Sequence, residues 1–336
     1  MALPQIQETL DTLYTTTWQL MREESIDNIF KTTPFWFYMT EGGRKTTEAG
    51  GRWIGIPLEY GDHRDTIKWI GKTHDLSTEN AAAKGKELLT TAQYNWRYVS
   101  ASVYRSWQDD TQNRGKSAMQ KIIDVKLKNV ETSLAEEMEY RLFQVGDPTD
   151  DVIEGLPHLI QDDPTVNVAG EGLVGGIDQS TETWWQNQAY DMTDETVVAT
   201  LVPRMRTMFN DCSKGQDMPG ILLTTQAVYE LYEDEVMDYM TIMKESGTKG
   251  DASFESIIFK GRPLMYSDEC PTGKMYELNL KYLEWVADEN VNFEMTEWKT
   301  GRADLDRVAQ ILCAGNLVCS NRARQGVIFG IGQTTP

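Results

Sequence analysis

Three glycines supply the clearest chemical pattern in the chain. Gly170, Gly172 and Gly175 have the spacing of the glycine fingerprint that binds the pyrophosphate of a dinucleotide. A pyrophosphate bound in this way lies at the N-terminus of a helix that follows the glycines directly. Residues 176–180, GIDQS, do not begin a helix. The context argues against a nucleotide cofactor. An acidic oxidoreductase built around residues 170–176 is an alternative that saturable nucleotide binding would reveal.

Acidic and sulfur-containing side chains are the other candidates for chemistry. Five acids gather on one expected helix: Glu230, Glu233, Asp234, Glu235 and Asp238. An acid–base or metal site would need them to converge on a pocket, so we expect a solvated helix face. The cysteines and histidines are scattered, which fits free thiols in a reducing compartment better than zinc or disulfides. They are Cys212, Cys270, Cys313, Cys319, His63, His74 and His158.

The usual signatures of catalysis are missing. The sequence contains no Walker loop, no HExxH or GxSxG motif and no convincing catalytic triad. We therefore predict that the protein is not an enzyme, and we assign no catalytic, cofactor-binding or metal-ligating residue and no cofactor.

The composition predicts a folded, soluble chain. Of the 336 residues, 40% are hydrophobic and 25% are charged, enough for two or three linked lobes. No apolar run approaches the roughly 20 residues of a membrane span, and the first residues do not resemble a signal peptide. The net charge is -20, and residues 150–336 hold 31 acidic but only 14 basic side chains. This half is poorly suited to binding nucleic acid, and assembling copies must overcome its self-repulsion.

The longest helical pattern runs from Ser117 to Phe143. It has no Pro or Gly, and its apolar residues form one stripe: Met119, Ile123, Leu127, Val130, Leu134, Met138 and Leu142. At about 1.5 Å per residue such a helix is roughly 40 Å long, so a wide layer must lie across it. We expect the stripe to pack under a sheet. The lysines precede the glutamates Glu131, Glu136, Glu137 and Glu139, against the helix dipole, so these charges could serve partners; a solvated face is the simpler interpretation.

Residues 1–41 combine a helical pattern with an unusual aromatic run. Apolar residues from Ile6 to Ile26 predict a helix, and Pro34-Phe35-Trp36-Phe37-Tyr38 follows it. Such a run either docks on another subunit or caps the protein's own core, and the sequence leaves both possibilities open.

Two stretches with a period of two predict strands at residues 53–60 and 92–104, which we expect to pair antiparallel. In the second, Tyr94, Tyr98 and Tyr104 are expected on one face with Trp96. Residues 61–88 between the strands are polar and glycine-rich, with too few apolar side chains to offset the entropy of ordering them. The sequence therefore predicts an extended flap that rests on a neighbouring subunit.

The second half of the chain predicts an α+β arrangement. Residues 147–190 indicate an ordered loop in which Trp184 and Trp185 are buried. A helix is expected from Thr193, bent at Pro203, before a short buried strand at residues 221–223 and a helix from Thr225. Strands are then expected at 257–259, 262–266, 275–280, 283–286, 293–298, 308–319 and 326–331. Helices followed by a strand-rich tail favour α+β lobes over a doubly wound sheet.

In order and spacing, several segments resemble the major capsid proteins of tailed bacteriophages, which have the Hong Kong ninety-seven-type fold. The similarity covers nearly the whole chain, and no single segment decides it. The segments are Gly155-Leu156-Pro157-His158-Leu159-Ile160, residues 174–180, residues 184–187, Leu223-Thr224-Thr225, residues 259–264 with Asp268, and residues 315–322.

The resemblance implies a division of the chain. It implies an N-terminal arm (1–42), an E-loop with flanking strands of the peripheral domain (43–104), a peripheral-domain spine helix (105–149), an axial domain (150–305) and C-terminal strands that return to the sheets (306–336). In such proteins the arm and the E-loop lie on neighbouring subunits. Some members join a loop lysine to a neighbour's asparagine. Lys68, Lys72, Lys84 and Lys86 are available here, but we assign no cross-link.

The function implied is structural. We expect self-assembly into the pentamers and hexamers of an icosahedral head that encloses double-stranded DNA without sequence-specific binding, built in the host cytoplasm and found in the virion. The expected partners are further copies of the chain, a portal protein, in some heads a decoration protein and, because the chain begins almost directly with the arm, a separate scaffolding protein. An encapsulin-like compartment on the same fold is the nearer alternative; a cargo enzyme encoded alongside would favour it.

Overall fold

The computed structural model describes residues 33–40, 42–61, 64, 67, 87–108, 122–146, 151–167, 173–193, 195, 197–236, 257–300 and 306–332. Several sequence predictions lie outside these residues. They are the helix expected between Ile6 and Ile26, the body of the flap with Lys68, Lys72, Lys84 and Lys86, the start of the long helix at Ser117, and Gly170 and Gly172.

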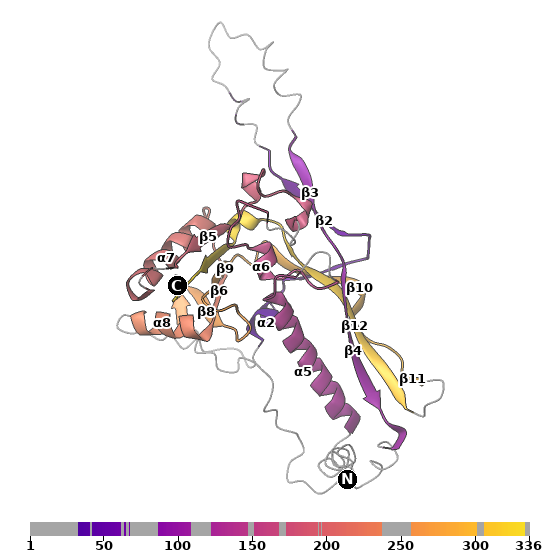
Figure 1. The fold of residues 1–336 in the computed structure, drawn as a ribbon. Helices are drawn as coiled ribbons and strands as arrows, with labels where there is room; N and C mark the ends of the chain where they lie inside the picture. The colour runs from indigo at the N-terminus through magenta and orange to yellow at the C-terminus, as the bar shows by residue number, and fades with distance from the viewer. Residues whose placement is uncertain are drawn as a thin grey trace, which may run out of the picture.

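One lobe is built on a five-stranded sheet. Its central strands are β10 (Leu283–Met295) and β12 (Arg307–Cys319), which pair antiparallel. The other strands are β4 (Arg97–Arg105) and β11 (Lys299–Thr300), both antiparallel to β12, and β1 (Lys45–Glu48), parallel to β10. The long helix α5 (Ile122–Leu142) packs against β4, as expected for a helix that lies under a sheet (Figure 1).

The other lobe is built on a six-stranded sheet. Its order is β5 (Gln188–Asp191), β13 (Gly326–Phe329), β9 (Met275–Leu278), β6 (Ile221–Thr224), β8 (Arg262–Tyr266) and β7 (Ile257–Phe259). The helices α7 (Val197–Cys212) and α8 (Gln226–Val236) share a hydrophobic cluster with one face of this sheet. Both helices and the short strand β6 were predicted, and α7 contains Pro203.

A larger hydrophobic core joins the two lobes. It contains residues from the other face of the six-stranded sheet, from α5 and from the five-stranded sheet, such as Tyr276, Phe143 and Trp285. The short helix α6 (Leu156–Leu159) also contributes to it. Because one core is shared, the two sheets are held in a fixed relation.

A two-stranded ribbon, β2 (Ile54–Glu59) with β3 (Leu89–Tyr94), projects from the rest of the molecule (Figure 1). Its antiparallel pairing was predicted, but the expected single strand 92–104 is wrong. The chain leaves the ribbon at Asn95 and Trp96 and enters the other sheet as β4. The break changes which face is buried, so Tyr94 is buried whereas Tyr98 and Tyr104 are exposed.

The aromatic run forms the helix α2 (Pro34–Thr40) and belongs to the protein's own core. Phe35 and Trp36 are buried, with Phe35 against Phe143 and Trp36 edge-on to Trp285. Phe37 points outward and is 58% exposed. Of the two interpretations that the sequence left open, capping of the core is therefore confirmed for this part of the run.

The strand-rich tail is confirmed with one change. The strands expected at 283–286 and 293–298 form a single strand, β10, whose pairing with β12 shifts register between Ala287 and Glu294. Because the irregularity interrupts the alternation of apolar and polar residues, the sequence pattern predicts two strands instead of one. The combination of separate helices and mainly antiparallel strands confirms the α+β class.

Candidate functional site

Among the residues that the structure describes, the sequence patterns that could carry chemistry do not come together in one site. Residues 174–176 make a single 3₁₀ turn, η3 (Val174–Gly176), and no helix begins in residues 177–182, so the helix that a dinucleotide fingerprint requires does not follow these residues. On α8, Glu230 and Asp234 are exposed. No group of three or more His, Cys, Asp or Glu within the described ranges could hold a metal ion.

The four cysteines are buried and free. Burial raises the pKa of every one of these thiols, to about 11 for Cys313 and about 12 for Cys319. Because the thiolate is the reactive and metal-binding form, these residues are inert at neutral pH.

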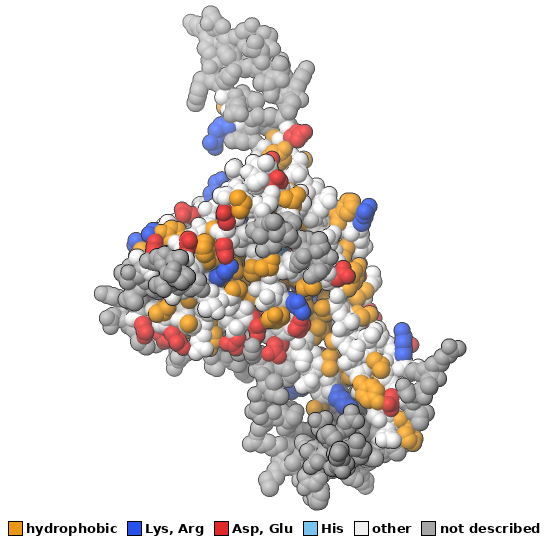
Figure 2. All heavy atoms as spheres, in the orientation of Figure 1, with side chains coloured by type: hydrophobic (Ala, Val, Ile, Leu, Met, Phe, Trp, Pro, Cys, Tyr) orange, Lys and Arg blue, Asp and Glu red, His pale blue; other side chains and the backbone are white. Residues whose placement is uncertain are grey.

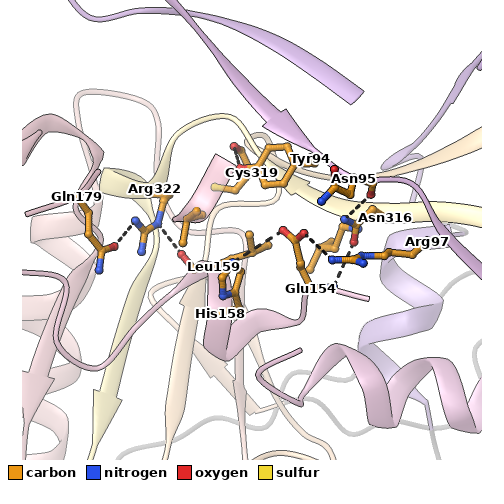
Figure 3. A network of polar contacts seen from close by, with 12 residues as sticks. Tyr94, Asn95, Arg97, Glu154, His158, Leu159, Gln179, Asn316, Cys319 and Arg322 are labelled. Atoms are coloured by element: carbon orange, nitrogen blue, oxygen red, sulfur yellow. Dashed lines mark hydrogen bonds and ion pairs between the residues drawn. The ribbon is translucent and has the colours of Figure 1, made fainter. Parts of the chain in front are cut away.

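The most organised polar centre surrounds Arg322, in the 3₁₀ turn η5 (Arg322–Arg324) (Figure 3). Its guanidinium is fully buried and donates four hydrogen bonds. The acceptors are the carbonyls of Leu159 (2.7 Å) and Trp185 (3.2 Å) and the side-chain oxygens of Gln179 (2.5 Å) and Asn187 (3.1 Å). Burial lowers the pKa of Arg322 to about 10, so the side chain remains charged at neutral pH.

A second layer of hydrogen bonds fixes these acceptors. Asn187 accepts from the backbone N–H of Gln161 (3.1 Å) and donates to its carbonyl (2.8 Å). Gln179 donates to the side chain of Gln161. These hydrogen bonds fix the orientation of the Asn187 and Gln179 side chains independently of Arg322. The centre is therefore preorganised and holds three segments of the chain together.

A linked group lies beside it and contains Arg97, Glu154 and Asn316 (Figure 3). Arg97 and Glu154 form a buried ion pair at 3.5 Å, and the amide of Asn316 bridges the backbone N–H of Glu154 (3.2 Å) and the carbonyl of Asn95 (3.0 Å). Burial raises the pKa of Glu154, and the positive charge of Arg97 opposes this effect. The group holds the point at which the chain passes from the ribbon into β4.

The ribbon rests on a glycine-rich loop formed by residues 173–187. Trp184 stacks on Tyr60 with ring centres 5.1 Å apart and planes 15° apart, while the indole N–H of Trp185 donates to the carbonyl of Val174 (3.0 Å). Gly175 has a φ of +62°, and a Cβ there would lie 3.0 Å from that of Ala92. Both conditions favour glycine, because β3 lies directly against this turn.

Burial of the two tryptophans was predicted, and it holds fully for one. Trp185 lies within the core, whereas Trp184 is only half-buried, with one face on Tyr60.

A buried carboxylate on α5 anchors α2. Glu139 accepts from the backbone N–H groups of Trp36 (2.6 Å) and Phe35 (3.3 Å) and from the hydroxyl of Ser267 (2.8 Å). Burial raises its pKa to about 7, against the lowering effect of these donors. The sequence prediction of a solvated face is wrong for this residue, because α2 covers it.

The sequence reasoning included Arg322 only as the last residue of a motif, and it missed the roles of Arg97, Glu139 and Glu154. One signal was available for Arg322, since a charged residue stands there between two apolar strands. The segments that carried the family resemblance are distant in sequence, yet four of them meet at this centre: 155–160, 174–180, 184–187 and 315–322.

The described surface carries its charge unevenly. Figure 2 shows acidic side chains gathered near α8 and few basic ones beside them. No helix in the described residues is long and apolar enough to cross a membrane.

No protein-family model and no curated protein matches the chain. Solved structures do match it over nearly its whole length. A chain of the Cyanophage A-1(L) capsid asymmetric unit has a TM-score of 0.66 and 16% identity, covering 94% of this chain and 98% of that one. The capsid of a native GTA particle has a TM-score of 0.56 and 9% identity, covering 93% and 94%.

An encapsulin is also among the similar structures. The holo-SrpI encapsulin complex of Synechococcus elongatus has a TM-score of 0.53 and 11% identity, covering 92% of this chain and 95% of that one. At these identities the likeness concerns the fold. The chain has the fold of phage capsid proteins, as the sequence resemblance implied.

Proposed function

We propose that the protein is the major capsid protein of a tailed double-stranded-DNA bacteriophage. Copies assemble into pentamers and hexamers of an icosahedral head that encloses the genome. The supporting observation is the match to the Cyanophage A-1(L) capsid, which covers 94% of this chain and 98% of that one.

The arrangement of the molecule supports the same role. One face of the ribbon packs on the core through Ile54, Leu58 and Ala92, whereas Gly55, Pro57 and Glu59 on its other face are exposed and have no cover in the single chain. Contact with a neighbouring copy would supply the missing surface. No chemical step is assigned, since the buried polar residues described above clamp segments of the chain together.

The proposed partners follow from this role. They are further copies of the chain, a scaffolding protein during assembly, a portal protein at one vertex and, in some heads, a decoration protein. The acidic surface opposes tight phosphate binding, so DNA would be enclosed without specific contacts. Assembly would take place in the host cytoplasm and the product would be found in the virion.

Negative-stain microscopy of the purified protein tests the proposal, both alone and coexpressed with the products of neighbouring genes. Closed shells support it, whereas a protein that remains a monomer under every condition contradicts it. The contents of the shells distinguish a phage head from an encapsulin-like compartment. Nuclease-protected double-stranded DNA supports a phage head, and a single copurifying enzyme favours an encapsulin-like compartment.

A further inference from the structure

A fully buried carboxyl group lies beneath α7. Glu277 belongs to β9, a strand in the middle of the six-stranded sheet, and its side chain is 0% exposed. Successive side chains of a strand point to opposite faces of the sheet. Tyr276 contributes to the core that joins the two lobes, whereas Met275 contributes to the hydrophobic cluster shared with α7. Glu277 therefore faces α7, on the same side of the sheet as Met275.

The surroundings of this carboxyl are apolar. Glu277 is paired with Leu222 on β6 and with Gly326 on β13. A Cβ at Gly326 would lie 2.6 Å from the sulfur of Met208 and 2.7 Å from that of Cys212, so the last turns of α7 lie directly on the sheet. The side chain is thus enclosed between a helix and a sheet.

The carboxyl of Glu277 lacks the partners that a buried charge needs. Among the described residues, neither of its oxygens has a hydrogen-bond partner. Glu139, the buried acid on α5, differs in accepting three hydrogen bonds. An ionised carboxylate is very costly to bury without donors, so the neutral acid is the form that fits this place. Burial accordingly raises the pKa of Glu277 well above its ordinary value of 4.5.

Other charged or titratable groups lie near Glu277 on α7, on η5 and in the turn between β7 and β8. Lys260, in that turn, favours ionisation of Glu277, but its ammonium donates to an asparagine of α7 at 2.7 Å. Asp211 on α7 has the opposite effect. The neutral thiol of Cys212 lies within electrostatic reach, as does Arg324 of η5 for that thiol. These charges oppose one another, so burial decides the protonation of Glu277.

We infer that Glu277 is a pH-sensitive latch, which keeps α7 closed on the six-stranded sheet while it is protonated and releases α7 when it ionises. The carboxylate formed at higher pH needs water, because the described residues around it supply no donor. Water can reach it when α7, the element that covers it, moves away. The inference does not depend on the shell function, since every contact it uses lies within one chain.

The closed and released states of α7 bind different numbers of protons. In the released state the carboxyl is solvated and has an ordinary pKa of about 4.5, whereas in the closed state its pKa is well above that value. The resulting stabilisation of the closed state is present below about pH 4.5 and is lost as the pH rises toward the raised pKa. Within that interval the opening equilibrium should grow about tenfold per pH unit.

Hydrogen exchange of the full-length protein, followed by mass spectrometry, measures the opening of α7. The protection of α7 amides, corrected for the intrinsic pH dependence of exchange, is compared at pH 5.5 and 7.5. It should fall roughly a hundredfold more in the wild type than in Glu277→Gln. The comparison cancels other titrating groups, including Glu139. The control Glu230→Gln, on the exposed face of α8, should behave like the wild type.

The amides of α5 provide an internal reference and should lose no more protection in the wild type than in Glu277→Gln. An equal pH dependence of α7 in the two proteins would overturn the inference. So would an equal loss of protection in α5 and α7, since the acid would then act on global unfolding.

A second neutral variant guards against misfolding of the first. Glu277→Met has an apolar side chain of similar length and should lack the pH dependence in the same way, so it serves as the reference if Glu277→Gln does not fold. Failure of both variants to fold would overturn the inference, because it would show that the fold requires the ionised carboxylate.

Discussion

Arg322 is the residue on which the joined segments depend most. Its four hydrogen bonds reach the α6 segment, the glycine-rich loop and the chain after η4 (Thr183–Trp185). Its burial is tolerated because polar groups that are themselves fixed surround the charge. A buried charge of this kind stabilises a structure only while its partners are complete.

Replacing Arg322 by Met should therefore be severe. The change leaves two carbonyls and two side-chain amides without their donor, and we expect a loss of roughly 3–5 kcal/mol in the free energy of unfolding. Urea denaturation followed by tryptophan fluorescence measures it. The control is Arg141→Met, which removes an exposed pair with Glu137 at 2.7 Å and should cost less than about 0.5 kcal/mol. Equal losses in the two variants would contradict the role given to Arg322.

Glu139 predicts a pH dependence whose sign is opposite to that of an exposed, paired carboxylate. Burial raises its pKa in the folded state from 4.5 to about 7. Between these two values the folded protein holds a proton that the unfolded chain has released. This contribution to stability is present below about pH 4.5 and is lost as the pH rises through 7.

The variant Glu139→Gln should remove that dependence while keeping an oxygen that can accept from Trp36. Other groups titrate too, so the quantity to compare is the difference between the unfolding free energies of the two proteins. From pH 4.5 to 7.5 the wild type should lose roughly 3 kcal/mol relative to the variant. Parallel stability curves would show that Glu139 keeps an ordinary pKa.

At the scale of elements, α5 connects the five-stranded sheet to the core shared by both lobes. Its stripe is most buried toward the C-terminal end, where Leu134, Met138 and Leu142 are buried. Leu127 and Val130 are only half-buried in the single chain. The predicted stripe is correct, but its depth increases along the helix.

Substitutions along α5 should follow this gradient. Leu134→Asp places an unpaired charge in the core and should cost roughly 3–5 kcal/mol, with most of the protein insoluble. Leu127→Asp can reach water and should cost distinctly less in the isolated subunit. Soluble yield and urea midpoints provide the comparison, and a reversed order would mean that the helix packs on a different face.

The flap is expected to be an element of contact between subunits. Replacing residues 62–86 by a short Gly-Ser turn removes none of the buried residues described in either hydrophobic cluster. The subunit should remain soluble with a near-normal circular dichroism spectrum, but it should not close into shells. Complete unfolding of the shortened subunit, or intact shells made from it, would each contradict this assignment.

The sequence predicted a helix or strand correctly where one hydrophobic period runs through the whole element. The stripe of α5, the strands β6 and β12 and the helices α7 and α8 follow from local patterns. It failed where two elements meet without a turn signal. Asn95 and Trp96 separate β3 from β4 without Gly or Pro, so the pattern gives one strand instead of two. Arg97, Glu139 and Glu154 were missed because the hydrogen-bond partners described above lie 57 to 162 residues away in sequence.

At the scale of the whole molecule, one core joins two sheets that each extend in their own direction, and a ribbon projects beyond both (Figure 1). This shape gives the molecule long edges along which neighbouring subunits could make contact. A net charge of -20 makes such contacts unfavourable unless complementary patches offset it, and assembly should therefore become more efficient as salt screens the repulsion.

The central claim is that copies of this chain close into a shell. Cryo-electron microscopy of particles formed by the purified protein, with a scaffolding partner where one is encoded nearby, tests it most directly. The account predicts closed icosahedral particles in which five and six copies surround the symmetry axes and each ribbon lies on an adjacent copy. Particles without such clusters, or ribbons that contact only their own subunit, would contradict it.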